Sequence, residues 1–270
     1  MGWGCWWSRP PNPSTCGVVF TPKRRRYCSC CGRSWDSVPA RLGYWLRKAL
    51  FVGFLLLVLW QAWIFAQVLW WRTHNPDSTS FMRLRAEARR EAGRGGLLPH
   101  PWVPYQRIPD SLKRAVVAAE DSNFVAHHGF DWEGMRRAID KDIRRGRPVA
   151  GGSTVTQQLA KNLFLSGRRS LWRKAEEALI TLMLEATWSK RRILEVYLNV
   201  IEWGDGVFGC AAASGHYYGE PVSALTPAQS ARLASMIPSP RYYDRHGETE
   251  RLLDKSDTIE VRMMMVTIPR

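Results

Sequence analysis

The longest apolar stretch of the chain runs from residue 49 to residue 71 and contains no charged side chain. At about 1.5 Å per residue, a helix of this length spans roughly 34 Å, which is enough to cross a bilayer. A buried core helix and a cleaved signal peptide are the alternatives for such a run. Charges bracket it on both sides, and no small-residue cleavage site follows it. Four tryptophans also gather toward its C-terminal end, as at a membrane interface. The pattern therefore predicts a retained transmembrane helix over residues 49–71.

Beyond residue 104, apolar positions recur at helical spacing, and no stretch alternates like a strand for long. Candidate capping residues precede these helical runs. They are Asp110 or Ser111, Asp131, Ser153, Ser170, Ser189 and Thr226. A length of 270 residues accommodates one medium-sized domain with an appendage. We expect a mainly α domain over residues 104–270, preceded by a linker over residues 72–103.

Charge is concentrated near the N-terminus. Residues 1–72 hold ten Lys/Arg and one acid, which supplies +9 of the net +15. Such charge suits nucleic acid or anionic lipid, but its place directly before an apolar helix is typical of a topology signal. We therefore expect a basic, disordered cytoplasmic tail over residues 1–48, no nucleic-acid partner, and a domain on the outer face of the cytoplasmic membrane.

Two further basic or sulfur-rich segments leave alternatives open. Arginines in the linker could lie near anionic headgroups or form a solvated face. These are Arg83, Arg85, Arg89, Arg90 and Arg94. Five of the six cysteines precede residue 32, so a disulfide framework for the domain is excluded. The cluster Cys28, Cys30 and Cys31 could bind zinc, but a reduced tail is favoured because a second spaced pair is absent from the sequence.

Three segments of the domain carry chemistry. Glu120 and Asp121 end an apolar helix beside aromatic and imidazole side chains, where a desolvated carboxylate could act as base or acid, or be a plain charged helix end. The run GGSTVTQQLAKN places two glycines before a helix start and presents N–H groups to a phosphate or sugar. Its spacing is not that of a nucleotide-binding P-loop. Arg173, Lys174 and Glu177 share a helical face, as ordinary salt bridges also would.

Taken together, five segments resemble the ordered motifs of the family 51 peptidoglycan glycosyltransferases, here of the monofunctional type. They are EDSNFVAHHGFD, GGSTVTQQLAKNLFL, RKAEEA, SKRRILEVYLN and the glycine-rich segment before AAASGHYYG, within residues 104–269. The resemblance implies a lysozyme-like, mainly helical fold with a globular head and a smaller, membrane-associated jaw. It also implies that lipid II and a growing lipid-linked glycan chain are the substrates, with membrane lipids as further partners. Transpeptidases and division or elongation proteins are candidate protein partners.

The resemblance further implies a role for each matching residue. Glu120 corresponds to the general base that deprotonates the 4-hydroxyl of the acceptor sugar, and Glu177 to a second acid at the donor's pyrophosphate. No cofactor is obligatory, although a divalent cation, magnesium or manganese, is a candidate near Glu177. The implied substrate-binding residues are Gly152, Ser153, Thr154, Gln157, Gln158, Lys161, Asn162, Arg169, Arg173, Lys174 and Arg241.

Two other functions remain to be weighed. A lytic peptidoglycan glycosidase would share an acidic residue and the expected fold, but it would not need the GGSTVTQQLAKN segment or a cluster of cations. A non-catalytic scaffold for cell-wall assembly would not need both Glu120 and Glu177. The chain ends at Arg270, directly after the glycosyltransferase-like region, so a bifunctional enzyme with a transpeptidase domain is not expected.

Overall fold

The computed structural model describes residues 37–146, 151–167 and 170–270, with side chains from residue 43 onward. The basic run at residues 23–26, the five cysteines of the tail and the predicted substrate-binding residue Arg169 lie outside the described residues. By its internal contacts, the chain divides into two units, residues 1–62 and residues 63–270.

The first helix, α1 (Ser37–Trp71), contains the predicted membrane span and begins before it. Its stretch Gly43–Trp71 is, in the described part of the chain, the one helix long and apolar enough to cross a membrane. Apolar side chains such as Leu50, Phe51 and Leu56 are largely exposed along it, as a lipid-facing helix requires. The prediction of an N-terminal membrane helix is confirmed, and it fits a single-pass anchor.

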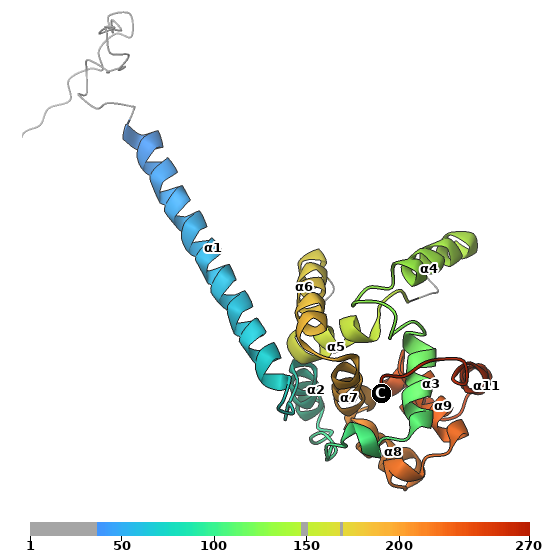
Figure 1. Cartoon of the computed structure of the whole chain (residues 1–270). Helices are drawn as coiled ribbons and strands as arrows, with labels where there is room; N and C mark the ends of the chain where they lie inside the picture. The colour runs from blue at the N-terminus through green and yellow to red at the C-terminus, as the bar shows by residue number, and fades with distance from the viewer. Residues whose placement is uncertain (1–36, 147–150, 168–169) are drawn as a thin grey trace, which may run out of the picture. The chain divides into compact units, whose positions relative to one another are not determined.

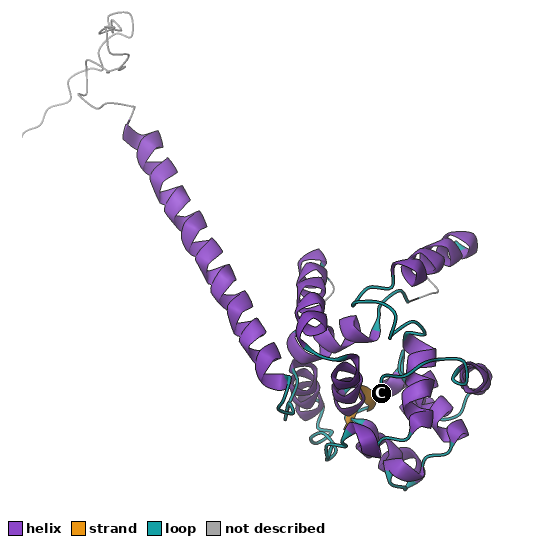
Figure 2. Ribbon diagram, in the orientation of Figure 1, coloured by secondary structure: helices purple, strands orange, loops and turns teal. Residues whose placement is uncertain are grey.

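The second unit is almost entirely helical, which confirms the predicted fold class (Figures 1 and 2). After α1 come α2 (Ser80–Glu91), the 3-10 turn η2 (Tyr105–Arg107), α3 (Asp110–Glu120), α4 (Trp132–Arg145), α5 (Val155–Phe164), α6 (Leu171–Thr187) and α7 (Lys190–Val200). The chain continues with β1 (Glu202–Gly204), β2 (Val207–Phe208), α8 (Cys210–Tyr218), the 3-10 turn η3 (Val222–Ala224), α9 (Pro227–Met236), α10 (Pro240–His246) and α11 (Glu250–Arg262). The two strands form an antiparallel hairpin.

Helix starts follow the local capping chemistry that the sequence indicated, with two exceptions. The side chains of four predicted capping residues accept a backbone N–H from the first turn, namely Asp131, Ser170, Ser189 and Thr226. The assignment of Ser153 was wrong, because Thr154 caps α5 through a reciprocal pair of hydrogen bonds with Gln157. The assignment of Asp110 or Ser111 was also wrong, because Pro109 occupies the cap of α3 and Asp110 is already helical.

Two groups of helices contribute to the core. Helix α3 packs against α9 and α11, while α5 packs against α2, α6 and α7. The largest fully buried side chains include Trp203, Tyr197 and Phe124. Helix α4 is different, because none of its residues, all of which are described, is buried, and it projects from the rest of the unit in Figure 1. This framework fixes the ends of α3, α5 and α7 relative to one another.

The last turns of α1 belong to the second unit and are held there by contacts with the end of α6 and with α7. Val68 is fully buried, and the indole of Trp188 donates to its carbonyl oxygen at 2.8 Å. The guanidinium of Arg192 donates to the carbonyl oxygens of Trp71 at 2.9 Å and of His74 at 2.6 Å. Since helix-terminal carbonyls otherwise lack partners, Arg192 serves as a cap for α1.

Residues 80–103 are also attached to the domain. Arg85 pairs with Glu202 at 3.1 Å, and Arg89 and Arg94 both pair with Asp205. Three of the five arginines predicted to be lipid-facing or solvated, Arg85, Arg89 and Arg94, instead bind acidic side chains of the β1–β2 hairpin. The segment that follows is held as well, since Asn199 exchanges two hydrogen bonds with the backbone of Val103.

Candidate active site

Glu120 is the last residue of α3, and it is presented at the wall of a cleft. The helix buries its apolar face, including Val116 and Val117, so its register directs Glu120 to the rim. One carboxylate oxygen accepts a hydrogen bond from the Gln158 amide at 2.8 Å. Burial raises the pKa of the Glu120 carboxyl, and the bond from Gln158 and the positive charges of Lys255 and Lys161 counteract part of that rise. A carboxylate tuned in this way is suited to general base catalysis.

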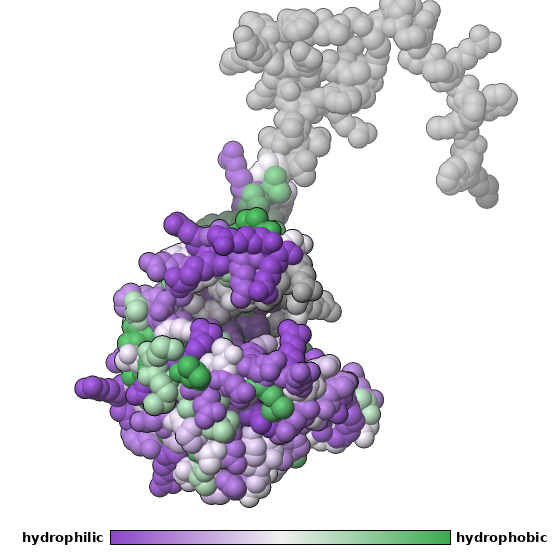
Figure 3. Space-filling model, turned by 90° about the vertical axis from the view of Figure 1, so that its right-hand side faces the viewer, coloured by the Kyte–Doolittle hydropathy of each residue, from purple (hydrophilic) through white to green (hydrophobic). Residues whose placement is uncertain are grey.

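Three cavities converge on this carboxylate and its glutamine partner. A cleft of about 730 Å³ is lined by Glu120, Gln158, Tyr242 and Lys255. A second cavity of about 300 Å³ is lined by Glu120 together with Gly152, Ser153 and Thr154. A third of about 210 Å³ lies against Gln158, Lys161, Asn162 and Arg241. Figure 3 shows one face of the molecule, largely hydrophilic and hollowed near its middle.

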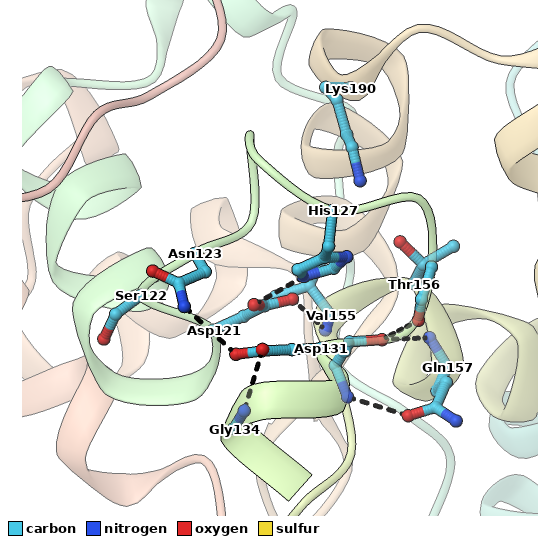
Figure 4. A network of polar contacts seen from close by, with 12 residues as sticks. Asp121, Ser122, Asn123, His127, Asp131, Gly134, Val155, Thr156, Gln157 and Lys190 are labelled. Carbon is cyan, nitrogen blue, oxygen red and sulfur yellow. Dashed lines mark hydrogen bonds and ion pairs between the residues drawn. The ribbon is translucent and has the colours of Figure 1, made fainter.

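The loop after Glu120 is tied to the start of α5 by Asp121. One of its oxygens accepts from the backbone N–H of Val155 at 3.0 Å, and the other from His127 Nε2 at 2.8 Å (Figure 4). Thr154 adds a bond from its hydroxyl to the carbonyl oxygen of Gly129 at 2.7 Å. The motif at Glu120 and the GGSTVTQQLAKN motif are thereby joined into one structure.

A second carboxylate, Glu177 on α6, is buried among cations. Its Oε2 accepts from Arg173 at 2.9 Å, and its Oε1 contacts the ammonium group of Lys174. Lys161 belongs to the same electrostatic cluster: burial lowers the pKa of its ammonium group, while the charge of Glu177 raises it. An acid that orients cationic side chains creates a site for a strongly anionic group such as a pyrophosphate.

Most of the predicted substrate-binding residues line the three cavities. Gly152, Ser153, Thr154, Gln158, Lys161, Asn162 and Arg241 do so. Arg173 and Lys174 are instead brought to Glu177. Gln157 is buried, and its amide oxygen accepts the backbone N–H of Thr154, so the structure places it in the cap of α5.

A model of the transglycosylase family matches residues 97–264, which is more than half of the chain. The chain belongs to this family.

Curated relatives are similar in sequence to this transglycosylase over most of its length. A protein of Azoarcus sp. (strain BH72) named biosynthetic peptidoglycan transglycosylase is 61% identical over 225 residues, covering 83% of this chain and 97% of the relative. Proteins of the same name from Methylobacillus flagellatus and Laribacter hongkongensis are 55% and 52% identical, covering 82% and 83% of this chain and 97% and 99% of theirs. The predicted family and the prediction of an enzyme, a glycosyltransferase, are confirmed.

The transglycosylase cleft also contains residues that the sequence did not single out. Lys255 on α11 lines the large cleft with Glu120 and donates to the carbonyl oxygen of Ser235 at 3.0 Å. The hydroxyl of Tyr197 on α7 donates to Gln158. Both lie on amphipathic helices far from Glu120 in sequence, so their proximity follows from the packing of α11 and α7, which no local motif signals.

Proposed function

We propose that this transglycosylase polymerises lipid II into glycan strands by inverting transfer, with Glu120 as the general base. The observation that carries the proposal is the position of Glu120, which lines two cavities at once and is hydrogen-bonded to a residue that lines a third. A carboxylate at such a junction can accept a proton from one bound sugar while a second sugar lies within reach of the resulting nucleophile.

The chemical step is a single displacement. Glu120 accepts the proton of the acceptor sugar's 4-hydroxyl, and the oxygen attacks the anomeric carbon of the donor. The bond from that carbon to the pyrophosphate oxygen breaks, and both of its electrons leave with the polyprenyl pyrophosphate. Because one bond forms as the opposite one breaks, the configuration at the anomeric carbon inverts.

The leaving group needs stabilisation rather than protonation, and the cation cluster supplies it. Lys161, Arg173 and Lys174 bring three basic side chains together around the single carboxylate of Glu177. Positive charge fixed in advance stabilises the charge that develops on a departing pyrophosphate. Because cationic side chains contact both oxygens of Glu177, we propose that they take the place of the candidate divalent cation at the leaving group.

Two of the three cavities suit the two substrates. The cavity at Lys161 and Asn162 is lined by three basic side chains, Arg85, Lys161 and Arg241, and one acid, Glu202, which suits the anionic lipid-linked donor. The larger cleft beside Glu120 and Lys255 suits the acceptor, because it brings the acceptor sugar to the base. This division assigns Gln158, which lines both, to the boundary between donor and acceptor.

Two rivals are less well supported by the same residues. A lytic glycosidase expels a sugar hydroxyl, so it needs a protonated acid at the leaving oxygen and gains little from a cluster of cations. A non-catalytic scaffold would not need a desolvated carboxylate directed into a cleft. The name of the relatives, biosynthetic peptidoglycan transglycosylase, describes synthesis and so agrees with the proposal.

Membrane contact is part of the proposed function. Trp132, Ile139 and Ile143 lie on one face of α4 and are 72%, 59% and 73% exposed, while the opposite face carries several arginines. Such a helix suits the interface between lipid headgroups and acyl chains. We assign α4 to the predicted jaw, with the N-terminus cytoplasmic and the domain periplasmic. Transpeptidases and division or elongation proteins are the protein partners that we propose for the chain.

The stereochemistry of the product tests the mechanism. The full-length protein in detergent is incubated with lipid II, whose sugar is α-linked to pyrophosphate, and the polymer is analysed by NMR. We expect β linkages throughout, as a single displacement requires. Retained α linkages would contradict the mechanism, because they require two successive displacements.

A further inference from the structure

Tyr197 reaches the proposed base through one intervening side chain. It lies on α7 and is fully buried. Its hydroxyl donates to Gln158 Oε1 at 2.9 Å, and Gln158 Nε2 donates to Glu120 Oε2 at 2.8 Å. The three side chains therefore form a relay of hydrogen bonds from the core to the cleft.

The relay works in one orientation of the glutamine amide. An amide has an oxygen that accepts and an NH₂ group that donates, and an ionised carboxylate can only accept. If the amide of Gln158 were turned over, its oxygen would face the carboxylate of Glu120, and the hydroxyl hydrogen of Tyr197 would lose its acceptor. A buried donor without a partner is costly, so the hydroxyl of Tyr197 selects the orientation in which N–H faces Glu120.

We propose that Tyr197 is a positioning residue, which fixes the amide of Gln158 with its N–H toward Glu120 and so holds the carboxylate of the base in place. The inference rests on the proposed role of Glu120. Tyr197 does not touch substrate in this account, and it acts through Gln158. It is distinct from the residues of the cation cluster, which serve the leaving group.

The ionisation of Glu120 supplies the readout. A hydrogen bond to the charged form lowers a carboxyl pKa, and the bond from Gln158 opposes the rise caused by burial. The other charges that act on Glu120 are Lys255 from α11, Lys161 from α5 and Asp121 from the following loop. They are unchanged when Tyr197 is altered, so a change in the titration of Glu120 reports on the amide.

The experiment is a pH profile of Tyr197→Phe with fluorescent lipid II and the full-length protein in detergent. Because the base acts when ionised, activity falls on the acid side. We expect the acid limb of kcat/KM to move to higher pH by up to about one unit, which is up to about a tenfold loss on that limb. At higher pH, activity should return close to the wild-type value.

Two further variants make the test specific. Tyr105→Phe removes another buried hydroxyl, which donates to the carbonyl oxygen of Pro269 at 2.6 Å, and should leave the limb in place. Gln158→Met removes the amide and should move the limb in the same direction as Tyr197→Phe. The double variant should then move it no further than Gln158→Met alone. If Tyr197→Phe folds poorly, Gln158→Met by itself tests whether the amide controls the titration of Glu120, and an unmoved limb would contradict the inference.

The outcomes separate this inference from the proposed function. If Glu120→Gln remains active, the assignment of the base fails, and the inference fails with it. If Glu120→Gln is inactive but Tyr197→Phe lowers activity equally at every pH, the base stands and the positioning role of Tyr197 is contradicted. Additive shifts in the double variant would contradict it as well.

Discussion

Replacing Asp121 by alanine should destabilise the domain far more than replacing Asp131. Both side chains accept a backbone N–H at the start of a helix, Asp121 from Val155 at 3.0 Å and Asp131 from Gly134 at 2.8 Å. They differ in solvent access, since the side chain of Asp121 is 1% exposed and that of Asp131 is 20% exposed. Water can take the place of Asp131 but cannot easily reach the partners of Asp121.

The magnitude follows from those partners. Asp121→Ala leaves the N–H of the fully buried Val155 without an acceptor, which costs about 1–3 kcal/mol. It also removes the bond from His127, and hydrogen bonds to charged groups contribute about 1.5–3 kcal/mol. We therefore expect a loss of about 3–5 kcal/mol in the free energy of unfolding. Asp131→Ala should cost about 1 kcal/mol, as for an ordinary helix cap.

Urea unfolding of the full chain in detergent, followed by pulse proteolysis, measures both losses under the same conditions. A double-mutant cycle with His127→Ala isolates the Asp121–His127 bond, and its coupling energy should be about 1–3 kcal/mol. Equal losses for Asp121→Ala and Asp131→Ala, or a coupling near zero, would refute the view that this buried aspartate joins the two motifs.

Three other predictions concern the backbone, the base and the anchor. Gly209 has φ 77° and ψ 152°, a region open essentially to glycine, and a Cβ there would lie 2.7 Å from the carbonyl oxygen of Asn199. Gly209→Ala should therefore lower the free energy of unfolding by about 3 kcal/mol or more. Gly219→Ala, at a left-handed position with open space around it, should lower it by only about 1–2 kcal/mol. Similar urea midpoints for the two variants would contradict the predicted clash at Gly209. Glu120→Gln should be more stable than wild type at neutral pH. The folded wild type raises the pKa of the Glu120 carboxyl, so it loses stability as pH rises through that pKa. In thermal unfolding, the difference in stability between variant and wild type should shrink as pH falls toward the ordinary carboxyl range, and a difference that grows would show that the pKa is lowered rather than raised. Arg192→Ala should increase backbone hydrogen exchange at the end of α1, because it removes the donor to the Trp71 and His74 carbonyl oxygens. Arg191→Ala, which removes a guanidinium stacked on Tyr105, should not. Unchanged exchange in Arg192→Ala would contradict the capping role of Arg192.

Features that depend on neighbouring residues were predictable from the sequence. The apolar run of α1 and the capping residues Asp131, Ser170 and Thr226 all act within a few positions of themselves. The errors were also local in origin. Ser153 and Thr154 are both good caps, and the choice between them was decided by Gln157, which completes the capping box with Thr154.

The site was predictable where a motif carries several polar residues together. The segment around Gln158 and Lys161 and the pair Arg173 and Glu177 are brought to cavities or to one another as their clustering suggested. Lys255 and Tyr197 could not be found this way. Each is a single polar group on an amphipathic helix, and its role depends on α11 packing on α3 or α7 packing on α5, which are contacts between distant segments.

The measurement that tests the central claim most directly is polymerisation of fluorescent lipid II by the wild type, Glu120→Gln and Glu133→Gln. Glu133 on α4 has an 83% exposed side chain, so its variant makes the same chemical change away from the cleft. We predict glycan polymer from the wild type and Glu133→Gln, digestible by a muramidase, and none from a folded Glu120→Gln. Polymer at the wild-type rate from Glu120→Gln, or none from a folded wild type, would contradict the assignment of Glu120 as the base of a peptidoglycan glycosyltransferase.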